Sequence, residues 1–222
     1  LQGGIAQDLL VRAMMELGYV AKEMKLDSRN YGSYEHRVRL YTVFARLDVH
    51  NAIGHLPRPK HATARAPAVR DIMVPLDERR AEASRTGEEL VFDLSQFRTV
   101  NVERDDSYNG CELILQGRDA QGQEGWQWKV HSPDKGASTQ RSQGINPTGL
   151  TLQEGHVVAH TLLESRRIVG IPDDADVGRD LLDDKEMRSA QGGVMNVCVL
   201  GAIADEIPDY LRRWDEHVLK MS

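Results

Sequence analysis

Two arginines spaced two residues apart carry the clearest chemical signal in this sequence. Arg37 and Arg39 follow a glycine-containing turn and lead into a β-branched and aromatic run, Val38 to Leu47. If this run is a strand that begins at Arg37, the alternation of side chains places both arginines on the same side. Two adjacent guanidiniums form a planar, permanently charged set of donors for an anion or the edge of a base. The alternative interpretation is a strand that begins with two solvated arginines.

The elements expected before and after the turn indicate the end of an α/β sheet. Residues 5–17 are predicted to form an amphipathic helix that stops at Gly18. Its apolar stripe consists of Ile5, Leu9, Ala13 and Leu17. Residues 19–24 are predicted as a short strand, and residues 38–47 as a longer strand that is apolar on both faces, as in a sheet covered on two sides. The numbering begins at Leu1, so we expect the true N-terminus and the earlier strands to lie outside this chain.

Composition and charge bound the classes of function. A chain of 222 residues is long enough for one domain or one and a half, and 40% hydrophobic and 28% charged residues are ordinary for a soluble globular protein. The net charge of −6 argues against a protein that binds nucleic acid by charge alone. Cys111 and Cys198 lie in apolar runs without metal-type spacing, which predicts buried thiols in a reducing intracellular compartment, nuclear or otherwise.

The middle of the chain changes in character twice. Residues 48–80 are interrupted by prolines and locally basic, which fits either a loop that follows a phosphate backbone or a solvated connection. Residues 88–131 are β-rich, and two alternating segments on either side of 117–125 predict a hairpin with one apolar face. Trp126 and Trp128 are interpreted as core residues of this sheet in preference to stacking platforms for bases. A mobile loop is expected over 136–149.

The C-terminal third is predicted to be mostly helical. Over 150–169 the spacing places His156, His160 and Glu164 on one helical face, but no second cluster completes a metal site, so none is predicted. Residues 173–186 are predicted to form an acidic, solvated connection. An apolar helix is expected to run through Ile207 and to stop at Pro208, followed by a final helix over 209–221.

Three motifs, in this order, resemble the cytosine-5 DNA methyltransferase family. The first is Tyr31-Gly32 followed by Glu35-x-Arg37-x-Arg39 and an apolar strand, where the family has glutamine in place of Glu35.

The second motif, Glu164 to Asp173, resembles the family segment glutamate-x-x-arginine-x-x-glycine-aromatic-proline-aspartate, with Ile171 at the aromatic position. Its Arg167 is predicted to be structural. The third, Gln191 to Leu200, resembles the last family motif, which closes over the methyl donor S-adenosylmethionine.

The resemblance implies an α/β fold: the C-terminal part of a Rossmann-like methyltransferase sheet plus a small β-rich region similar to a target-recognition domain. It implies that residues 1–50 end the α/β domain, that 51–150 form the target-recognition-like region, and that 151–222 are helices that return to the α/β domain. Arg39, with Arg37 beside it, matches the family arginine that hydrogen-bonds the cytosine O2.

The same resemblance places Gly192, Gly193 and Val194 at the S-adenosylmethionine site. The family has asparagine and a small hydroxyl residue or alanine where this chain has Gly193 and Val194, so backbone amides would have to replace those side chains.

The reacting half of the family's site is absent from the sequence. Neither a proline-cysteine loop, nor a glutamate-asparagine-valine motif, nor the glycine-rich turn for the donor is present. The resemblance therefore implies the C-terminal portion of a DNA (cytosine-5)-methyltransferase, active only when completed by a missing N-terminal half or another subunit, with DNA as substrate. One alternative is a catalytically inactive, methyltransferase-derived structural or interaction subunit of a larger complex. Another is an unrelated α/β binding protein whose arginine pair binds a different anion.

Overall fold

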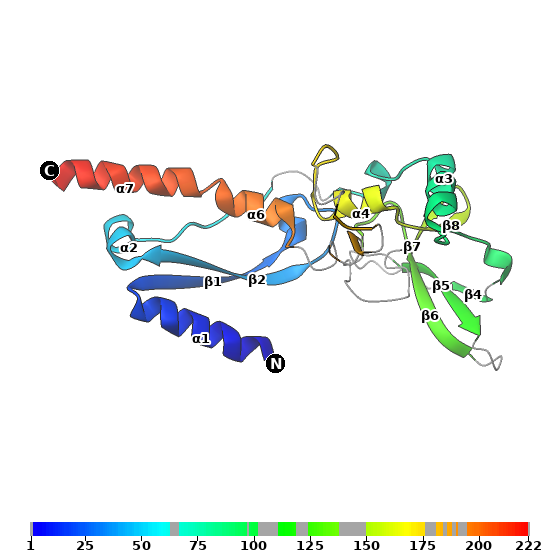
Figure 1. Ribbon diagram of the computed structural model, residues 1–222, viewed down its shortest axis with the longest axis horizontal. Helices are drawn as coiled ribbons and strands as arrows, with labels where there is room; N and C mark the ends of the chain where they lie inside the picture. The colour runs from blue at the N-terminus through cyan, green and yellow to red at the C-terminus, as the bar shows by residue number, and fades with distance from the viewer. Residues whose placement is uncertain are drawn as a thin grey trace. The chain divides into compact units, whose positions relative to one another are not determined.

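The computed structural model divides the chain into two compact units (Figure 1). The first comprises Leu1–Asp27, Val38–His61 and Val199–Ser222, and the second comprises Ser28–Arg37 and Ala62–Cys198. The residues that the structure describes are 2–62, 67–96, 98–101, 111–118, 124–137, 150–175, 181–183, 186–187, 190 and 195–221. Most of the expected loop over 136–149 and much of the acidic connection over 173–186 lie outside these ranges.

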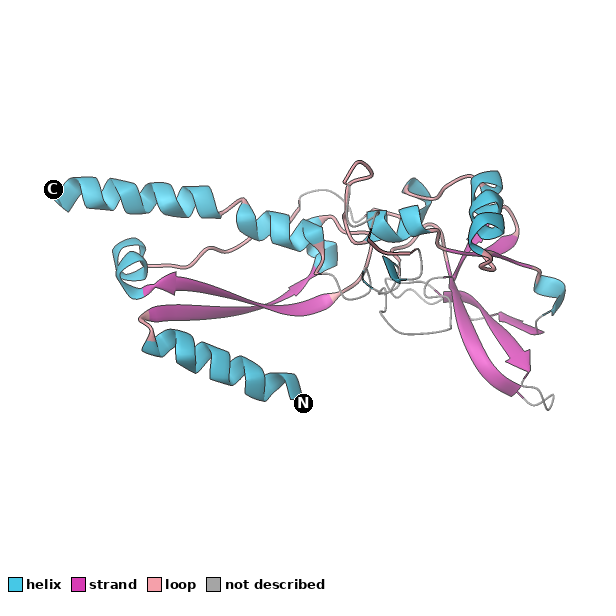
Figure 2. Ribbon diagram, viewed as in Figure 1, coloured by secondary structure: helices cyan, strands magenta, loops and turns pink. Residues whose placement is uncertain are grey.

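The first unit is built on two antiparallel strands with helices before and after them (Figure 2). Helix α1 (Gln2–Glu16) is followed by β1 (Tyr19–Asp27), β2 (Val38–Arg46) and α2 (Leu47–Ile53). The strands pair along their full length, from Tyr19 opposite Arg46 to Asp27 opposite Val38. The predicted helix and both predicted strands are confirmed, and β1 is longer than the sequence indicated.

The C-terminal helices belong to the first unit from Val199 onward. The single helix expected to run through Ile207 is wrong, because α6 (Val197–Ala204) ends before α7 (Ile207–Met221) begins. Pro208 lies in the first turn of α7, where the missing N–H would have no partner in a helix, so it starts a helix rather than stopping one. Tyr210 of α7 is buried in a cluster with Ala45 and Leu56, to which Ile53 of α2 also contributes.

The second unit contains a mixed six-stranded sheet in its described part, in the order β3-β8-β7-β6-β5-β4. Its strands are β3 (Val91–Phe92), β4 (Arg98–Asn101), β5 (Cys111–Arg118), β6 (Glu124–His131), β7 (Leu150–Gln153) and β8 (His156–Ala159). Only the β6–β7 pairing is parallel among these neighbours. The predicted hairpin is confirmed as β5–β6.

Trp128 belongs to the hydrophobic core of this sheet. Trp128 packs edge-to-face against buried Phe92, with ring centroids 5.6 Å apart and an angle of 72° between the ring planes. Val130 and Val157 are fully buried beside them. Trp128 therefore serves the core, as predicted, while the side chain of Trp126 lies outside the description.

The helix predicted over 150–169 is wrong in its first half. Strands β7 and β8 form a hairpin there, with the turn at Glu154 and Gly155, which both have positive φ (49° and 79°). Helix α4 spans only Leu162–Ile168. The β-branched pair Val157 and Val158 fits a strand buried on both faces. The two histidines and the glutamate at four-residue spacing therefore share no helical face.

The basic segment 48–80 is not a simple solvated loop. It contains α2, the short 3₁₀ helix η2 (Val69–Asp71) and the start of α3 (Leu76–Thr86), while η1 (Ser28–Tyr31) and η3 (Leu94–Gln96) are 3₁₀ turns elsewhere. Arg79 in α3 is fully buried. None of the helices in the described ranges is long and apolar enough to cross a membrane.

A buried ion pair joins three segments of the second unit. The Glu164 carboxylate accepts hydrogen bonds from both terminal nitrogens of Arg79, at 2.8 and 2.5 Å, so the pair is bidentate. It also accepts from the backbone N–H groups of Val74 (2.8 Å) and Thr161 (2.7 Å). Thr161 in return caps α4 by accepting from the Glu164 N–H at 3.2 Å.

Gly170, in the second family-like motif, meets the start of α6. Its φ is +85°, and a Cβ built on it would lie 2.9 Å from Cys198 Sγ and 3.3 Å from Val197 Cβ. The Val197 N–H donates to the Val169 carbonyl at 3.0 Å in the same place. Glycine is therefore required here both by its backbone angle and by the close approach of α6.

Replacing Glu164 by glutamine is expected to destabilise the second unit by about 3–5 kcal/mol, because it leaves the buried Arg79 charge without its counter-ion. Urea unfolding monitored by circular dichroism measures this loss. The exposed pair of Arg212 and Glu216 provides the control, and Glu216→Gln should stay within about 0.5 kcal/mol. Equal losses in the two variants would contradict the buried pair's role.

The pKa of Glu164 predicts how the stability of the second unit changes as the pH falls. Burial opposes its ionised form, but His160 and Arg79 outweigh that effect and hold the pKa of Glu164 below its ordinary value of 4.5. A depressed pKa in the folded state contributes stability at pH values above 4.5 that is lost as the pH falls through the folded pKa. Glu164→Gln should therefore flatten the acid limb of a plot of unfolding free energy against pH.

Gly170→Ala is expected to cost more than Gly87→Ala, which provides a matched control. Gly87 also has a positive φ, +71°, but an added Cβ there meets nothing within 4 Å. The control should lose about 1–2 kcal/mol from backbone strain alone. Cys198→Ala should recover part of the Gly170→Ala loss in a double-mutant cycle, since it removes the nearest atom. Equal costs at the two glycines would contradict the close approach.

Candidate functional site

The loop that leads into β2 is closed by one serine. The Ser28 hydroxyl donates to the Glu35 carbonyl at 2.6 Å and accepts from the Arg37 N–H at 3.0 Å. The Ser28 N–H donates to the Arg37 carbonyl at 3.1 Å. Because Ser28 is fully buried, these bonds hold both ends of the loop together away from water.

Asn196 joins this loop to the start of α6. Its amide nitrogen donates to Ser33 Oγ at 2.7 Å and to Glu35 Oε1 at 3.2 Å. Its amide oxygen accepts from the Cys198 N–H at 3.1 Å, as an N-cap side chain does. The side chains of Ser33, Glu35 and Asn196 are all fully buried. Two of the family-like motifs, far apart in the sequence, are therefore in direct contact.

The two arginines have different environments. Arg37 precedes β2, is only 3% exposed, and has Nη1 3.8 Å from Glu35 Oε2. Arg39 lies on β2 opposite Leu26 and its side chain is exposed. Strand β2 begins at Val38, as predicted, so the condition that the strand begin at Arg37 is not met: Arg37 belongs to the hydrogen-bonded loop. The expected fork of two equivalent guanidiniums is corrected accordingly: one is buried beside a carboxylate and the other faces solvent.

The segment assigned to the methyl donor, Gly192, Gly193 and Val194, lies outside the described residues. Of the described residues next to it, Asn196 is the polar one, and both ends of its amide are bonded within the chain. The described part of this region therefore offers no side chain that fits S-adenosylmethionine, and we derive no step through that group.

The cysteines do not provide an activated nucleophile in the described structure. Cys198 is half-buried at the start of α6, and burial, with a smaller contribution from the negative charge of Glu35, raises the pKa of its thiol. A raised pKa keeps a thiol protonated at neutral pH and unreactive. The backbone of Cys111 lies in β5, and its side chain is outside the description.

Arg167 holds the second motif together, which agrees with its predicted structural role. Its guanidinium makes a bidentate pair with Asp173, at 2.9 and 2.6 Å, and donates to the Ile72 carbonyl at 3.0 Å. Hydrogen bonding from Arg167 lowers the pKa of Asp173. The motif thereby ties α4 to the segment after η2.

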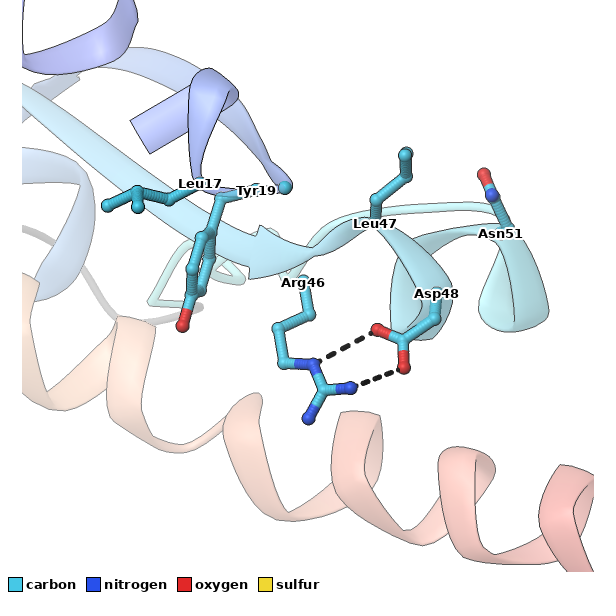
Figure 3. Close-up of a pocket in the computed structure, with 7 residues that line it drawn as sticks. Leu17, Tyr19, Arg46, Leu47, Asp48 and Asn51 are labelled. Carbon is cyan, nitrogen blue, oxygen red and sulfur yellow. Dashed lines mark hydrogen bonds and ion pairs between the residues drawn. The ribbon is translucent and has the colours of Figure 1, made fainter. Parts of the chain in front are cut away.

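A separate open hollow lies at the far end of the β1–β2 pair (Figure 3). Arg46 and Asp48 form a bidentate pair along it, with Arg46 Nη2 2.7 Å from Asp48 Oδ2. Tyr19 and Leu47 contribute to its walls. Since its one described guanidinium is already paired with a carboxylate, we assign no ligand to it.

Sequence reasoning missed the polar residues that assemble the site. Ser28, Ser33 and Asn196 were not predicted, although an asparagine directly before an apolar helix is a recognisable N-cap signal. Arg79 was grouped with the basic stretch 48–80, interpreted either as a loop that follows a phosphate backbone or as a solvated connection, and no local pattern marks it as buried.

Sequence comparisons give no family. A scan against protein-family models finds no match, and a search of curated proteins finds none either.

Three of the solved structures that resemble the chain are methyltransferases. The S. pombe Dnmt2 methyltransferase matches with a TM-score of 0.56 and 12% identity, over 93% of this chain and 63% of that one. The Entamoeba histolytica methyltransferase EhMeth matches with a TM-score of 0.59 and 13% identity, over 92% and 58%. A Spodoptera frugiperda DNMT2 mutant matches with a TM-score of 0.51 and 11% identity, over 94% and 62%.

The chain thus spans 58% to 63% of the length of these three structures. Their low sequence identity makes the likeness one of fold. The predicted fold class is confirmed: this is a mixed α/β chain with a methyltransferase-like, Rossmann-related architecture and a mixed sheet.

Proposed function

We propose that this chain is the C-terminal portion of a cytosine-5 nucleic-acid methyltransferase, which contributes target recognition and a cytosine contact. The observation that carries the proposal is the contact between two family-like motifs, through Glu35 and Asn196, within a methyltransferase-like fold. The reactive thiol and the main donor contacts are supplied by a missing N-terminal segment or a second polypeptide.

Arg39 is the residue of this chain that contacts the cytosine. It matches the family arginine that binds the cytosine O2, and its exposed guanidinium is available for that role. The donor geometry of a guanidinium suits the edge of a base. Arg37 is less suited, since its side chain is buried beside Glu35.

The first unit carries apolar surface that supports a missing neighbour. The predicted apolar stripe of α1 is exposed, with Ile5 at 70% and Leu9 at 61%. The opposite side of the helix contacts the strands, where Gln7 donates to Glu23 Oε1 at 3.1 Å and to Thr42. Monomeric proteins seldom leave such a stripe uncovered.

The edges of the two-stranded sheet, which are unpaired in the part of the chain that the structure describes, are further evidence for a missing neighbouring segment. In the described residues β1 and β2 pair only with each other, and Leu40 on β2 is half exposed. A two-stranded sheet is marginal by itself, and its unpaired edges are templates for further strands. The remaining strands of a methyltransferase sheet are the natural occupant.

A catalytically inactive structural or interaction subunit is the second candidate. The observation that favours it is the internal use of Asn196 and Arg37, which leaves Arg39 as the remaining exposed arginine of the motif. The two candidates differ in donor binding: calorimetry on the assembled complex should show S-adenosylmethionine binding for the enzyme and none for the inactive subunit.

Arg39→Ala should reduce methyl transfer to DNA by at least about tenfold in a complex with a polypeptide that carries proline-cysteine and glutamate-asparagine-valine loops, since it removes a charged hydrogen bond to the base. Transfer of a labelled methyl group to DNA measures it. Arg46→Ala, an exposed arginine at the other end of β2, is the matched control and should change little. Equal losses in the two variants would refute the assignment of Arg39.

Leu9→Glu should abolish co-purification of the completing polypeptide while leaving the chain folded, because it places a charge on the exposed stripe of α1. Pull-down from co-expressing cells measures the association, and circular dichroism checks the fold. Asp8→Lys, also exposed on α1 but outside the apolar stripe, provides the control. Retention of the partner by Leu9→Glu would show that this stripe is not its binding surface.

A further inference from the structure

Glu35 is a fully buried carboxylate at the position where the resembled family has a neutral glutamine. Burying a carboxylate that has no hydrogen-bond or ion-pair partner is strongly disfavoured, so the partners of Glu35 indicate its role. Oε1 accepts from the Asn196 amide at 3.2 Å, and Oε2 faces Arg37 Nη1 at 3.8 Å. The chain therefore uses this charge to hold one asparagine and one arginine together.

The orientation of Asn196 is fixed by its contacts. The amide nitrogen faces two acceptors, Ser33 Oγ and Glu35 Oε1, while the amide oxygen faces the Cys198 N–H. A flipped amide would place its oxygen against the Glu35 carboxylate and its NH₂ against an N–H donor. Asn196 consequently acts as a directional link from Glu35 to the first turn of α6.

From these contacts we infer that Glu35, Arg37 and Asn196 form a charged latch that positions the start of β2, and with it Arg39. Arg37 is then a positioning residue committed to the latch, and Arg39 alone of the two arginines touches the base. The Ser28 bonds hold the backbone of the same Arg37, two residues before Arg39, while the latch holds its side chain. The inference rests on the proposed function only for the role of Arg39.

The latch is tested by exchanging the hydrogen-bond donor at position 196 and the acceptor at position 35. Asn196→Asp places a second carboxylate within hydrogen-bonding distance of Glu35, so the pair retains one proton and its folded pKa is raised. Among the described residues, the Arg37 guanidinium, whose charge opposes this shift, and the weakly acidic Cys198 thiol also face Glu35. A raised folded pKa gives stability that is present at low pH and lost as the pH rises through it.

The melting temperature of Asn196→Asp should therefore fall by about 3–6 °C between about pH 5 and about pH 8, relative to the unmodified chain. Adding Glu35→Gln should remove this pH dependence, because the glutamine amide donates to the new aspartate and Ser33 keeps a hydroxyl to donate. An identical pH profile in Asn196→Asp and the unmodified chain, or no rescue in the double variant, would overturn the latch.

The Cys198 thiol gives a second measurement that does not require Asn196→Asp to fold. Glu35→Gln removes a negative charge that raises the pKa of this thiol, so alkylation should begin at lower pH. The measurement uses Cys111→Ser, which leaves Cys198 as the single thiol of the sequence. An unchanged pH profile of alkylation would show that Glu35 carries no charge there, and the latch would fail.

The positioning of Arg39 is tested by a double-mutant cycle in the completed complex, with affinity for a cytosine-containing single strand measured by fluorescence anisotropy. Glu35→Gln should weaken binding, and it should have no further effect once Arg39→Ala is present. Additive losses would overturn the positioning role. Melting and alkylation need no nucleic acid, so their failure refutes the latch alone, whereas absent binding by the unmodified complex refutes the proposed function.

Discussion

The second unit depends on one fully buried carboxylate. Glu164 accepts four hydrogen bonds from three segments, and Arg79, its counter-ion, also donates to the Ala159 carbonyl at the end of β8. This geometry fixes α4 against α3 and β8. Because α4 is fixed, Gly170 lies where α6 can begin against it, and Asn196 comes within reach of the loop that leads to β2. The candidate site is thus assembled from contacts that begin at a structural ion pair.

The first unit, in contrast, exposes apolar side chains to solvent. Its core around Ala45, Leu56 and Tyr210 is small, and apolar side chains on α1 and β2 remain in water. Hydrophobic burial is roughly proportional to area, so covering these side chains would stabilise an association without any new polar contact.

Local patterns in the sequence predicted the elements with strong periodicity. Helix α1, strands β1 and β2 and the β5–β6 hairpin follow from alternation and turn residues. The β7–β8 hairpin was missed because histidines at four-residue spacing imitated a helix, although Val157 and Val158 favour a strand. Pro208 was misread as a stop because its position relative to the helix start is not visible in the sequence.

The site was predictable only in part, for a physical reason. The arginine strand carries a local motif, but the bonds of Asn196 to Ser33 and Glu35 join residues more than 160 positions apart. The burial of Arg79 likewise depends on Glu164, a carboxylate 85 positions away in the sequence. A sequence shows that such charges exist, and only the fold shows which of them face each other.

The central claim, that the receiving and reacting halves of the site lie on different polypeptide segments, has a direct chemical test. DNA containing 5-fluorocytosine traps a methyltransferase covalently: a thiolate adds to C6 and C5 takes the methyl group of S-adenosylmethionine. Because C5 carries fluorine in place of hydrogen, no proton can be removed there to expel the thiolate. The completed complex, given S-adenosylmethionine and this DNA, is digested and the adduct located by mass spectrometry. We predict an adduct on the proline-cysteine loop of the completing segment. An adduct on Cys111 or Cys198 of this chain would contradict the account.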